Sequence, residues 1–176
     1  MPKFPYAKLA LAAAIGLASQ GAFADDGTID FIGEIVDAPC SIAPESQNLV
    51  VPLGKVSKAE LSAAGKKSTP AVFKIKLLNC GASAKGATVT FNGATDATVK
   101  DTLSVTAGKV SGSGASGVAV ELQDSSGAKI PVGAPSNEYA LNVGDNPLVF
   151  KAVYVATAAA TPGAADATAQ FTVTYK

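Results

Sequence analysis

Three residue types are missing from this 176-residue chain: histidine, tryptophan and, because all 14 basic residues are lysines, arginine. Without histidine there is no His-based acid–base pair, no catalytic triad and no His metal ligand. Without arginine there is no bidentate clamp for phosphate, and a formal net charge of zero argues against a nucleic-acid partner. We therefore expect no catalytic residue, metal, cofactor, small-molecule substrate or nucleic-acid partner. The length suits one domain.

Long apolar runs are also scarce, and the only notable one spans the ten residues from Leu9 to Ala18. Lys3 and Lys8 lie on its N-terminal side, and Ala22-Phe23-Ala24 follows it. A membrane anchor is the competing interpretation, but a spanning helix needs about 20 apolar residues. The pattern predicts a secretory signal over residues 1–24, removed by cleavage between Ala24 and Asp25. Removing 24 of 176 residues leaves an exported, soluble chain of 152, with 12 lysines against 14 acidic residues and a net charge of −2.

Cysteine occurs only twice, as Cys40 and Cys80. Metal binding would need further Cys or His ligands, and a redox motif would bring the two cysteines close in sequence. In an oxidising compartment a lone pair of cysteines forms a structural disulfide. The chain-entropy model gives such a 40-residue loop about 4 kcal/mol of stabilisation.

From Asp25 onward the apolar residues recur with a period of two, between Gly, Pro, Asn and Asp punctuation, which is typical of short strands. The expected inward-facing sets are Phe73, Ile75 and Leu77; Ala87, Val89 and Phe91; Val118, Val120 and Leu122; Tyr139, Leu141 and Val143; and Ala167, Ala169, Phe171, Val173 and Tyr175. Leu148–Val155 is the most apolar segment and follows a break at Asp145-Asn146-Pro147. About seven short strands with one disulfide predict an all-β fold, an antiparallel β-sandwich of immunoglobulin type.

Other local signals predict connections between the strands. Ser57-Lys-Ala-Glu60 is a capping box closed by Gly65, which predicts a short helix. Asn92-Gly93 predicts a turn. Gly108–Gly117 is rich in Gly and Ser and is expected to be a surface loop, and Lys66-Lys67 is expected to be a solvated turn.

The two ends of the exported chain carry the functional signal. Near the N-terminus, Ile29, Phe31, Gly33 and Ile35 lie on one face of an extended segment and alternate with Asp30, Ile32 and Glu34. The simpler interpretation is that this segment is an ordinary first strand of the sandwich. At the other end, an alternating strand stops at Tyr175-Lys176 with no chain left to cover its edge. An apolar edge strand at a terminus is a template for pairing unless something covers it.

These features together resemble the pilin subunits of chaperone–usher fimbriae, most closely the type 1 major (shaft) pilins. The resemblance covers the whole exported chain and rests on five features. They are the signal, the alternating segment around Gly33, the two cysteines about forty residues apart, the penultimate Tyr175 and Gly163 at the fourteenth position from the end.

The resemblance implies an incomplete immunoglobulin-like sandwich that lacks its final strand and is completed by donor-strand exchange. It implies an N-terminal donor extension over residues 25–36 and a pilin domain over residues 37–176. Ile29, Phe31 and Ile35 would fill the groove of a neighbouring subunit, with Gly33 where a side chain would not fit. Gly163, Phe171, Val173 and Tyr175 would line the groove and contact a periplasmic chaperone, whose basic residues would hold the carboxylate of Lys176.

The implied partners are other copies of the chain and other pilins in a linear polymer, the chaperone, and an outer-membrane usher. The implied location, after export through the periplasm, is an adhesive fimbria on the bacterial surface. Two alternatives stay open: a minor or adaptor pilin of the same assembly, and a self-complete secreted sandwich that binds carbohydrate. Catalysis by Asp25 and Asp26 is the least favoured interpretation, because this pair is better explained as a solvated N-terminus of the exported chain.

Overall fold

The computed structural model describes residues 27–33, 35, 39–106 and 114–176. The chain divides into two units, residues 1–36 and 37–176, and each is described by itself. The predicted signal peptide, the cleavage site at Ala24 and Asp25, and most of the predicted Gly/Ser loop lie outside the described residues. No helix among the described residues is both long and apolar enough to cross a membrane.

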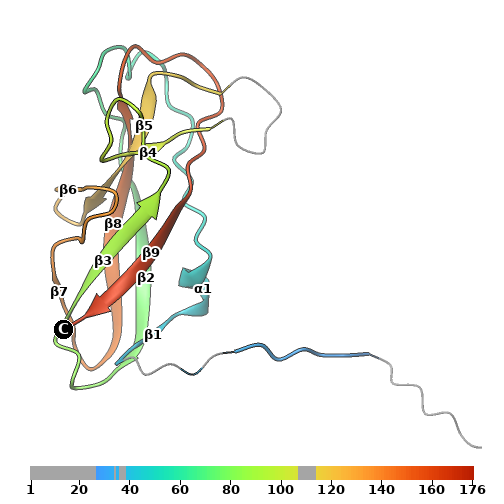
Figure 1. Cartoon of the computed structure of the whole chain (residues 1–176), viewed down its shortest axis with the longest axis vertical. Coiled ribbons are helices and arrows are strands. Elements are labelled where there is room, and N and C mark those ends of the chain that lie inside the picture. The colour runs from blue at the N-terminus through green and yellow to red at the C-terminus, as the bar shows by residue number, and fades with distance from the viewer. Residues whose placement is uncertain (1–26, 34, 36–38, 107–113) are drawn as a thin grey trace, which may run out of the picture. The chain divides into compact units, whose positions relative to one another are not determined.

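Two antiparallel sheets make up the second unit (Figure 1). The larger sheet has the order β1 (Ser41–Ile42), β2 (Ala71–Cys80), β8 (Gly144–Ala156), β5 (Val118–Asp124) and β4 (Leu103–Ser104), with β6 (Lys129–Ile130) also paired to β5. The smaller sheet has the order β7 (Tyr139–Ala140), β3 (Gly86–Gly93) and β9 (Ala169–Tyr175). One short helix, α1 (Pro44–Gln47), follows β1. The predicted all-β sandwich is confirmed.

The core lies between the sheets and is built from the inward faces that the alternation predicts. Ile75, Leu77 and Val89 are fully buried. Phe150 of β8 lies at the centre, with ring centroids 5.1 Å from Phe91, 5.6 Å from Phe73 and 5.2 Å from Tyr139. Because Phe91 belongs to the smaller sheet, and Phe73 and Phe150 to the larger, this aromatic cluster joins the two layers.

The predicted helix at Ser57–Gly65 is wrong, because this segment forms consecutive turns. Ser57 Oγ does accept a hydrogen bond from the amide of Ala59 at 3.3 Å, as a capping residue would. However, the backbone of Leu61 and Gly65 is bonded to Ala160 and Ala156. These long-range bonds compete with the helical ladder, so tertiary contacts override the local signal. Gly65 adopts φ +84°, which suits a glycine.

Two predicted breaks lie inside strands. Asn92 and Gly93 close β3 and pair with Gln170 and Ala169 of β9. Asp145-Asn146-Pro147 lies within β8, where Pro147 pairs with Lys76. Proline is tolerated there because β5 runs beside β8 only from Phe150 to Ala156, so Pro147 has a strand on one side only.

Two positions predicted to face solvent are buried, and one predicted to face inward is exposed. Glu121 and Gln123 of β5 are buried, although the alternation places them on the outer face. Lys67, expected to lie in a solvated turn, forms an ion pair in which its Nζ lies 2.6 Å from Glu121 Oε1. Val143 is 73% exposed, because β7 ends at Ala140 and the chain then turns into β8.

Candidate functional site: a groove beside the last strand

β9 lies at an edge of the smaller sheet, with β3 as its one strand partner among the residues described. On β3, the inward-facing Ala87, Val89 and Phe91 are buried. Their direct neighbours on β9, namely Tyr175, Val173 and Phe171, are only half-buried. The same core therefore covers β3 completely and leaves β9 partly open, because no strand of the described residues lies on the free side of β9.

The opposite wall is residues 49–56, which follow α1. Their side chains alternate: Val51 and Leu53 are half-buried, whereas Val50 and Pro52 are exposed. No backbone N–H or C=O of residues 49–56 bonds to another described residue. Backbone polar groups are normally paired in a folded protein. Residues 49–56 are therefore an extended segment whose backbone groups have no strand partner among the described residues, and this segment faces the free edge of β9.

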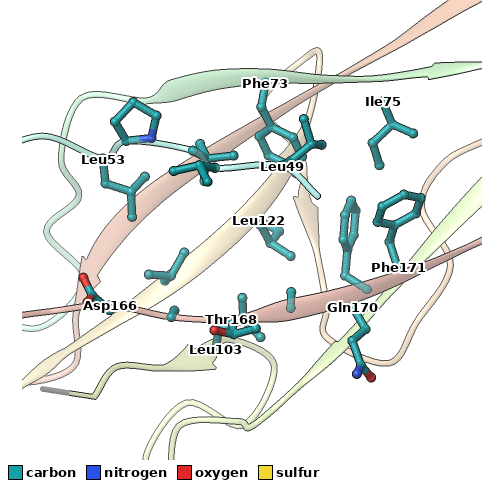
Figure 2. A pocket seen from close by; sticks show the side chains of 18 of the residues that line it. Leu49, Leu53, Phe73, Ile75, Leu103, Leu122, Asp166, Thr168, Gln170 and Phe171 are labelled. Carbon is teal, nitrogen blue, oxygen red and sulfur yellow. The ribbon is translucent and has the colours of Figure 1, made fainter. Parts of the chain in front are cut away.

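A cavity of about 1000 Å³ lies between these two edges. Figure 2 shows Leu49 and Leu53 on one side and Phe171 pointing into the cavity from β9, whereas Gln170 points away. The floor is apolar and comes from both sheets, with Phe73, Ile75, Phe91, Leu103, Val120 and Leu122 among its residues. A second cavity of about 460 Å³ shares four lining residues with the first, namely Gly54, Tyr154, Ala165 and Asp166. The two are thus adjoining parts of one groove.

The predicted groove residues have different positions. Phe171 lines the larger cavity and Gly163 lines the smaller one. Val173 and Tyr175 lie on the same face of β9 and pack against the core without lining either cavity. The wall formed by residues 49–56 was not predicted; Leu49-Val50-Val51 is apolar, but only the tertiary structure places it opposite β9.

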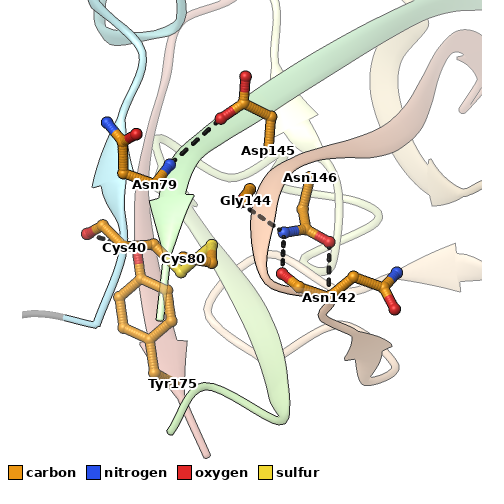
Figure 3. Close-up of a disulfide and its surroundings, with 8 residues drawn as sticks. All are labelled: Cys40, Asn79, Cys80, Asn142, Gly144, Asp145, Asn146 and Tyr175. Atoms are coloured by element: carbon orange, nitrogen blue, oxygen red, sulfur yellow. Dashed lines mark hydrogen bonds between the residues drawn. A yellow bond between two sulfur atoms is a disulfide. The ribbon is translucent and has the colours of Figure 1, made fainter. Parts of the chain in front are cut away.

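Tyr175 connects the end of β9 to the start of the domain (Figure 3). Its hydroxyl donates to the carbonyl oxygen of Cys40 at a long 3.5 Å. Burial raises the pKa of Tyr175 above the ordinary value of 10.0, at which a phenol is already neutral at physiological pH and can act as a donor.

Lys176 is held by its backbone and its side chain. Its main-chain oxygen accepts from the amides of Lys85 at 2.9 Å and Gly86 at 3.3 Å. Its Nζ lies 2.7 Å from Oε2 of Glu138, a partner with no signal in the sequence. The end of the chain is thus anchored to the start of β3.

The predicted disulfide between Cys40 and Cys80 is present, with a Cα–Cα distance of 4.2 Å. Beyond Cys40, the chain docks on β2 through α1. Ser46 Oγ accepts from the amide of Lys76 at 3.0 Å, and the amide of Ala43 donates to the Lys76 carbonyl at 3.0 Å. These links hold the beginning of the 49–56 wall on the larger sheet.

Among the described residues, the charged groups that line the groove lie at one end, in the smaller cavity that precedes the first residue of β9. They are Lys55, Lys58 and Asp166. Beside them, the Tyr154 hydroxyl donates to the carbonyl oxygen of Ala165 at 2.7 Å. Burial, followed by the charge of Asp166, raises the pKa of Tyr154. The described residues hold no group of three or more His, Cys, Asp or Glu side chains that could bind a metal.

The described residues of the N-terminal segment, 27–33 and 35, form neither helix nor strand. Their large apolar side chains are almost fully exposed: Phe31 is 92% exposed, Ile32 96% and Ile35 103%, with Ile29 at 77%. Glu34 and Val36 lie outside the described residues. Isoleucine and phenylalanine are among the residues most often buried in folded proteins. Four such side chains in one exposed segment are typical of an interaction surface.

Comparisons with known proteins agree with this geometry. The family model described as "Fimbrial protein" matches residues 29–176. The chain is 41% identical over 172 residues to a "Fimbrial subunit type 1" of Klebsiella pneumoniae, covering 93% of each chain. A chaperone–usher pilus structure is similar with a TM-score of 0.71 at 31% identity, covering 86% of this chain and 96% of that one. The P pilus rod subunit PapA is similar with a TM-score of 0.65 at 30% identity, covering 79% and 100%.

A family match over most of the chain, relatives aligned over most of their own length and the open groove beside β9 lead to one conclusion. This chain belongs to the fimbrial protein family, as a structural pilin subunit with an incomplete immunoglobulin-like sandwich of the kind completed by donor-strand exchange.

Proposed function

We propose that residues 25–36 are the donor strand and residues 37–176 the acceptor domain of a surface pilus, with the chain serving as a main-shaft subunit. The observation that carries this proposal is the groove between the unpaired edge of β9 and the unpaired segment 49–56. A strand inserted there can form ladders on both sides. The exposed Ile29, Phe31 and Ile35 are suited to the apolar floor.

The energies account for a durable, non-covalent link. Burying an aliphatic or aromatic side chain stabilises by about 1.5–3 kcal/mol, so three contribute about 5–9 kcal/mol. Each new backbone hydrogen bond adds about 1 kcal/mol net. Because the inserted strand completes a core, subunits can separate only through partial unfolding, which makes dissociation slow.

Before assembly, a periplasmic chaperone covers the same groove by lending a strand along β9, and an usher at the outer membrane then exchanges it. Phe171, Val173 and Tyr175 contact the chaperone strand. The chaperone's basic residues hold the carboxylate of Lys176. The backbone bonds from Lys85 and Gly86 to the main-chain oxygen of Lys176 support this role, because they fix the end of the chain directly after β9, at the start of the neighbouring strand β3.

The donor assignment is tested by neighbouring substitutions with opposite expectations. Phe31→Asp places a charge in the groove and should abolish SDS-resistant fibres sheared from the cell surface. Ile32→Asp is the matched control, because residue 32 alternates to the outer face of the inserted strand; it should leave the fibre yield unchanged. Equal yields from the two variants would contradict the assignment.

The acceptor side is tested on β9 in the same way. Phe171→Asp with Tyr175→Asp should abolish recovery of a complex with the chaperone. Thr172→Asp with Thr174→Asp adds the same charges to the exposed face of the same strand and should leave the complex intact. If both pairs of substitutions give wild-type yield, the chaperone strand does not bind along β9.

A further inference from the structure

The charges of this chain are distributed unevenly between donor and acceptor. The proposed donor strand, residues 25–36, together with the residue that follows it carries five carboxylates and no lysine: Asp25, Asp26, Asp30, Glu34 and Asp37. The remaining 139 residues of the exported chain carry 12 lysines against nine carboxylates. The donor segment is therefore strongly acidic, and the domain that receives it is basic.

Two lysines line the groove, and neither is neutralised. Lys55 and Lys58 are exposed at the smaller cavity, and no carboxylate of a described residue lies within 4.0 Å of either Nζ. By contrast, the lysines at positions 67, 76, 129 and 176 all have carboxylate partners. Of the described residues, Asp166 is the one acidic residue that lines the groove, so the charged end of the groove has two lysines against one carboxylate and is net positive.

The direction of the inserted strand decides which donor carboxylates reach these lysines. Every pair of named strands in the described chain is antiparallel. A donor antiparallel to β9 would align the seven residues Ile29–Ile35 with the seven residues of β9. Its C-terminal end would then lie at the start of β9. The smaller cavity, lined by residues 160–166, precedes that point.

We infer that Lys55 and Lys58 receive Glu34 and Asp37 of another copy of this chain, and that this pairing speeds insertion and favours the antiparallel direction. The inference rests on the proposed donor-strand function. A parallel donor would bring Asp25 and Asp26 to the lysines instead, so the two directions predict different partners. Complementary charges at a partly exposed entrance act chiefly on the association rate and on specificity, and added salt screens them.

The test measures how fast a fluorescent peptide of residues 25–38 binds the monomeric exported chain. From low to high ionic strength the association rate should fall by about tenfold, the lower range for electrostatic steering. A Glu34→Gln, Asp37→Asn peptide should lose that salt dependence. A peptide with Asp25→Asn and Asp26→Asn, which carries the same net charge, should keep most of it.

Charge reversal on the acceptor domain tests whether Lys55 and Lys58 are the lysines that pair with the donor. Lys55→Glu with Lys58→Glu should slow the wild-type peptide and restore fast binding of a Glu34→Lys, Asp37→Lys peptide. Lys74→Glu with Lys100→Glu is the matched control. These lysines are exposed, unpaired and outside both cavities, so their reversal should change the rate much less and should give no rescue.

The outcomes separate this inference from the proposed function. If the wild-type peptide binds and its rate is indifferent to Glu34, Asp37, Lys55 and Lys58, the charge pairing is overturned and donor-strand insertion stands. If the Asp25 and Asp26 substitutions remove the salt dependence instead, the antiparallel assignment of the pairing is overturned. If the wild-type peptide binds no better than a Phe31→Asp, Ile35→Asp peptide, both the inference and the proposed function fail.

Discussion

The surroundings of Glu121 cannot be predicted from its position in the sequence. It occupies an outward position of β5, yet it is buried. Its Oε1 accepts from Lys67 Nζ at 2.6 Å and from Gln123 Nε2 at 2.8 Å, and its Oε2 lies 3.9 Å from Lys129 Nζ. A buried carboxylate is tolerated only when it is paired and hydrogen-bonded, and here residues from three segments supply the partners.

Removing one of these partners should therefore be costly. Lys67→Ala is expected to lower the free energy of unfolding by about 1–2 kcal/mol, because Glu121 loses a charge-assisted bond while it stays buried. Lys66→Ala is the matched control, since the Lys66 side chain is exposed and forms no ion pair with a described residue; it should change stability by less than about 0.5 kcal/mol. Urea unfolding measures both. Equal losses would mean that the Lys67–Glu121 pair does not contribute to stability.

At the scale of elements, the β5–β6 hairpin is closed by the buried Asp124. One carboxylate oxygen accepts from the amides of Ser126 and Ala128 at 2.8 and 2.9 Å and from the Ser126 hydroxyl at 2.6 Å. The other accepts from Asn137 Nδ2 at 2.9 Å. The Ser126 hydroxyl bond, followed by the Asn137 and backbone bonds, lowers the pKa of Asp124 below its usual 3.8.

The lowered pKa of Asp124 determines how its contribution to stability depends on pH. A carboxylate whose pKa is lower in the folded state stabilises fully above the pKa of the unfolded chain, and this stability is lost as the pH falls through the folded pKa. Asp124→Asn should therefore cost about 1–2 kcal/mol at pH 7 and much less well below pH 3.8. Urea unfolding at both pH values tests this, with the exposed Glu60→Gln as a control. A cost that is the same at both pH values would exclude the carboxylate charge as its source.

β9 is the element on which sequence and structure agree best. Phe171, Val173 and Tyr175 alternate with threonines, and the structure places them on one face against the core. The wrong helix prediction at Ser57 shows where prediction from local sequence signals fails. A capping signal is local, but Gly65 and Leu61 bond to Ala156 and Ala160, about a hundred residues further along, and local propensity cannot anticipate such partners.

At the scale of the whole domain, the sandwich is open along one side and carries one disulfide near its start. Cys40 and Cys80 join the start of the domain to the end of β2 and thereby hold the chain that leads into the 49–56 wall. The core is complete between β2, β3 and β8, but it ends at the groove beside β9. We therefore expect this cross-link to contribute strongly to the stability of an isolated subunit.

Replacing both cysteines by serine is expected to lower the free energy of unfolding by up to about 4 kcal/mol, the chain-entropy value for a 40-residue loop. Urea unfolding of the oxidised wild type, the reduced wild type and the double variant measures the effect. The last two should unfold at the same urea concentration. A double variant as stable as the oxidised protein would show that other contacts hold the wall.

The sequence by itself determined the periodicity of the strands, the pairing of two lone cysteines, the apolar face of the last strand and the acidic, apolar segment near the N-terminus. All of these are local or compositional properties. Only the tertiary structure decided that residues 49–56 face β9 across a groove, that Glu121 is buried between lysines and that Lys55 and Lys58 stand at the groove's end. The physical reason is that alternation specifies which side chains share a face, whereas the identity of the opposite wall depends on strand register and on contacts between residues far apart in the chain.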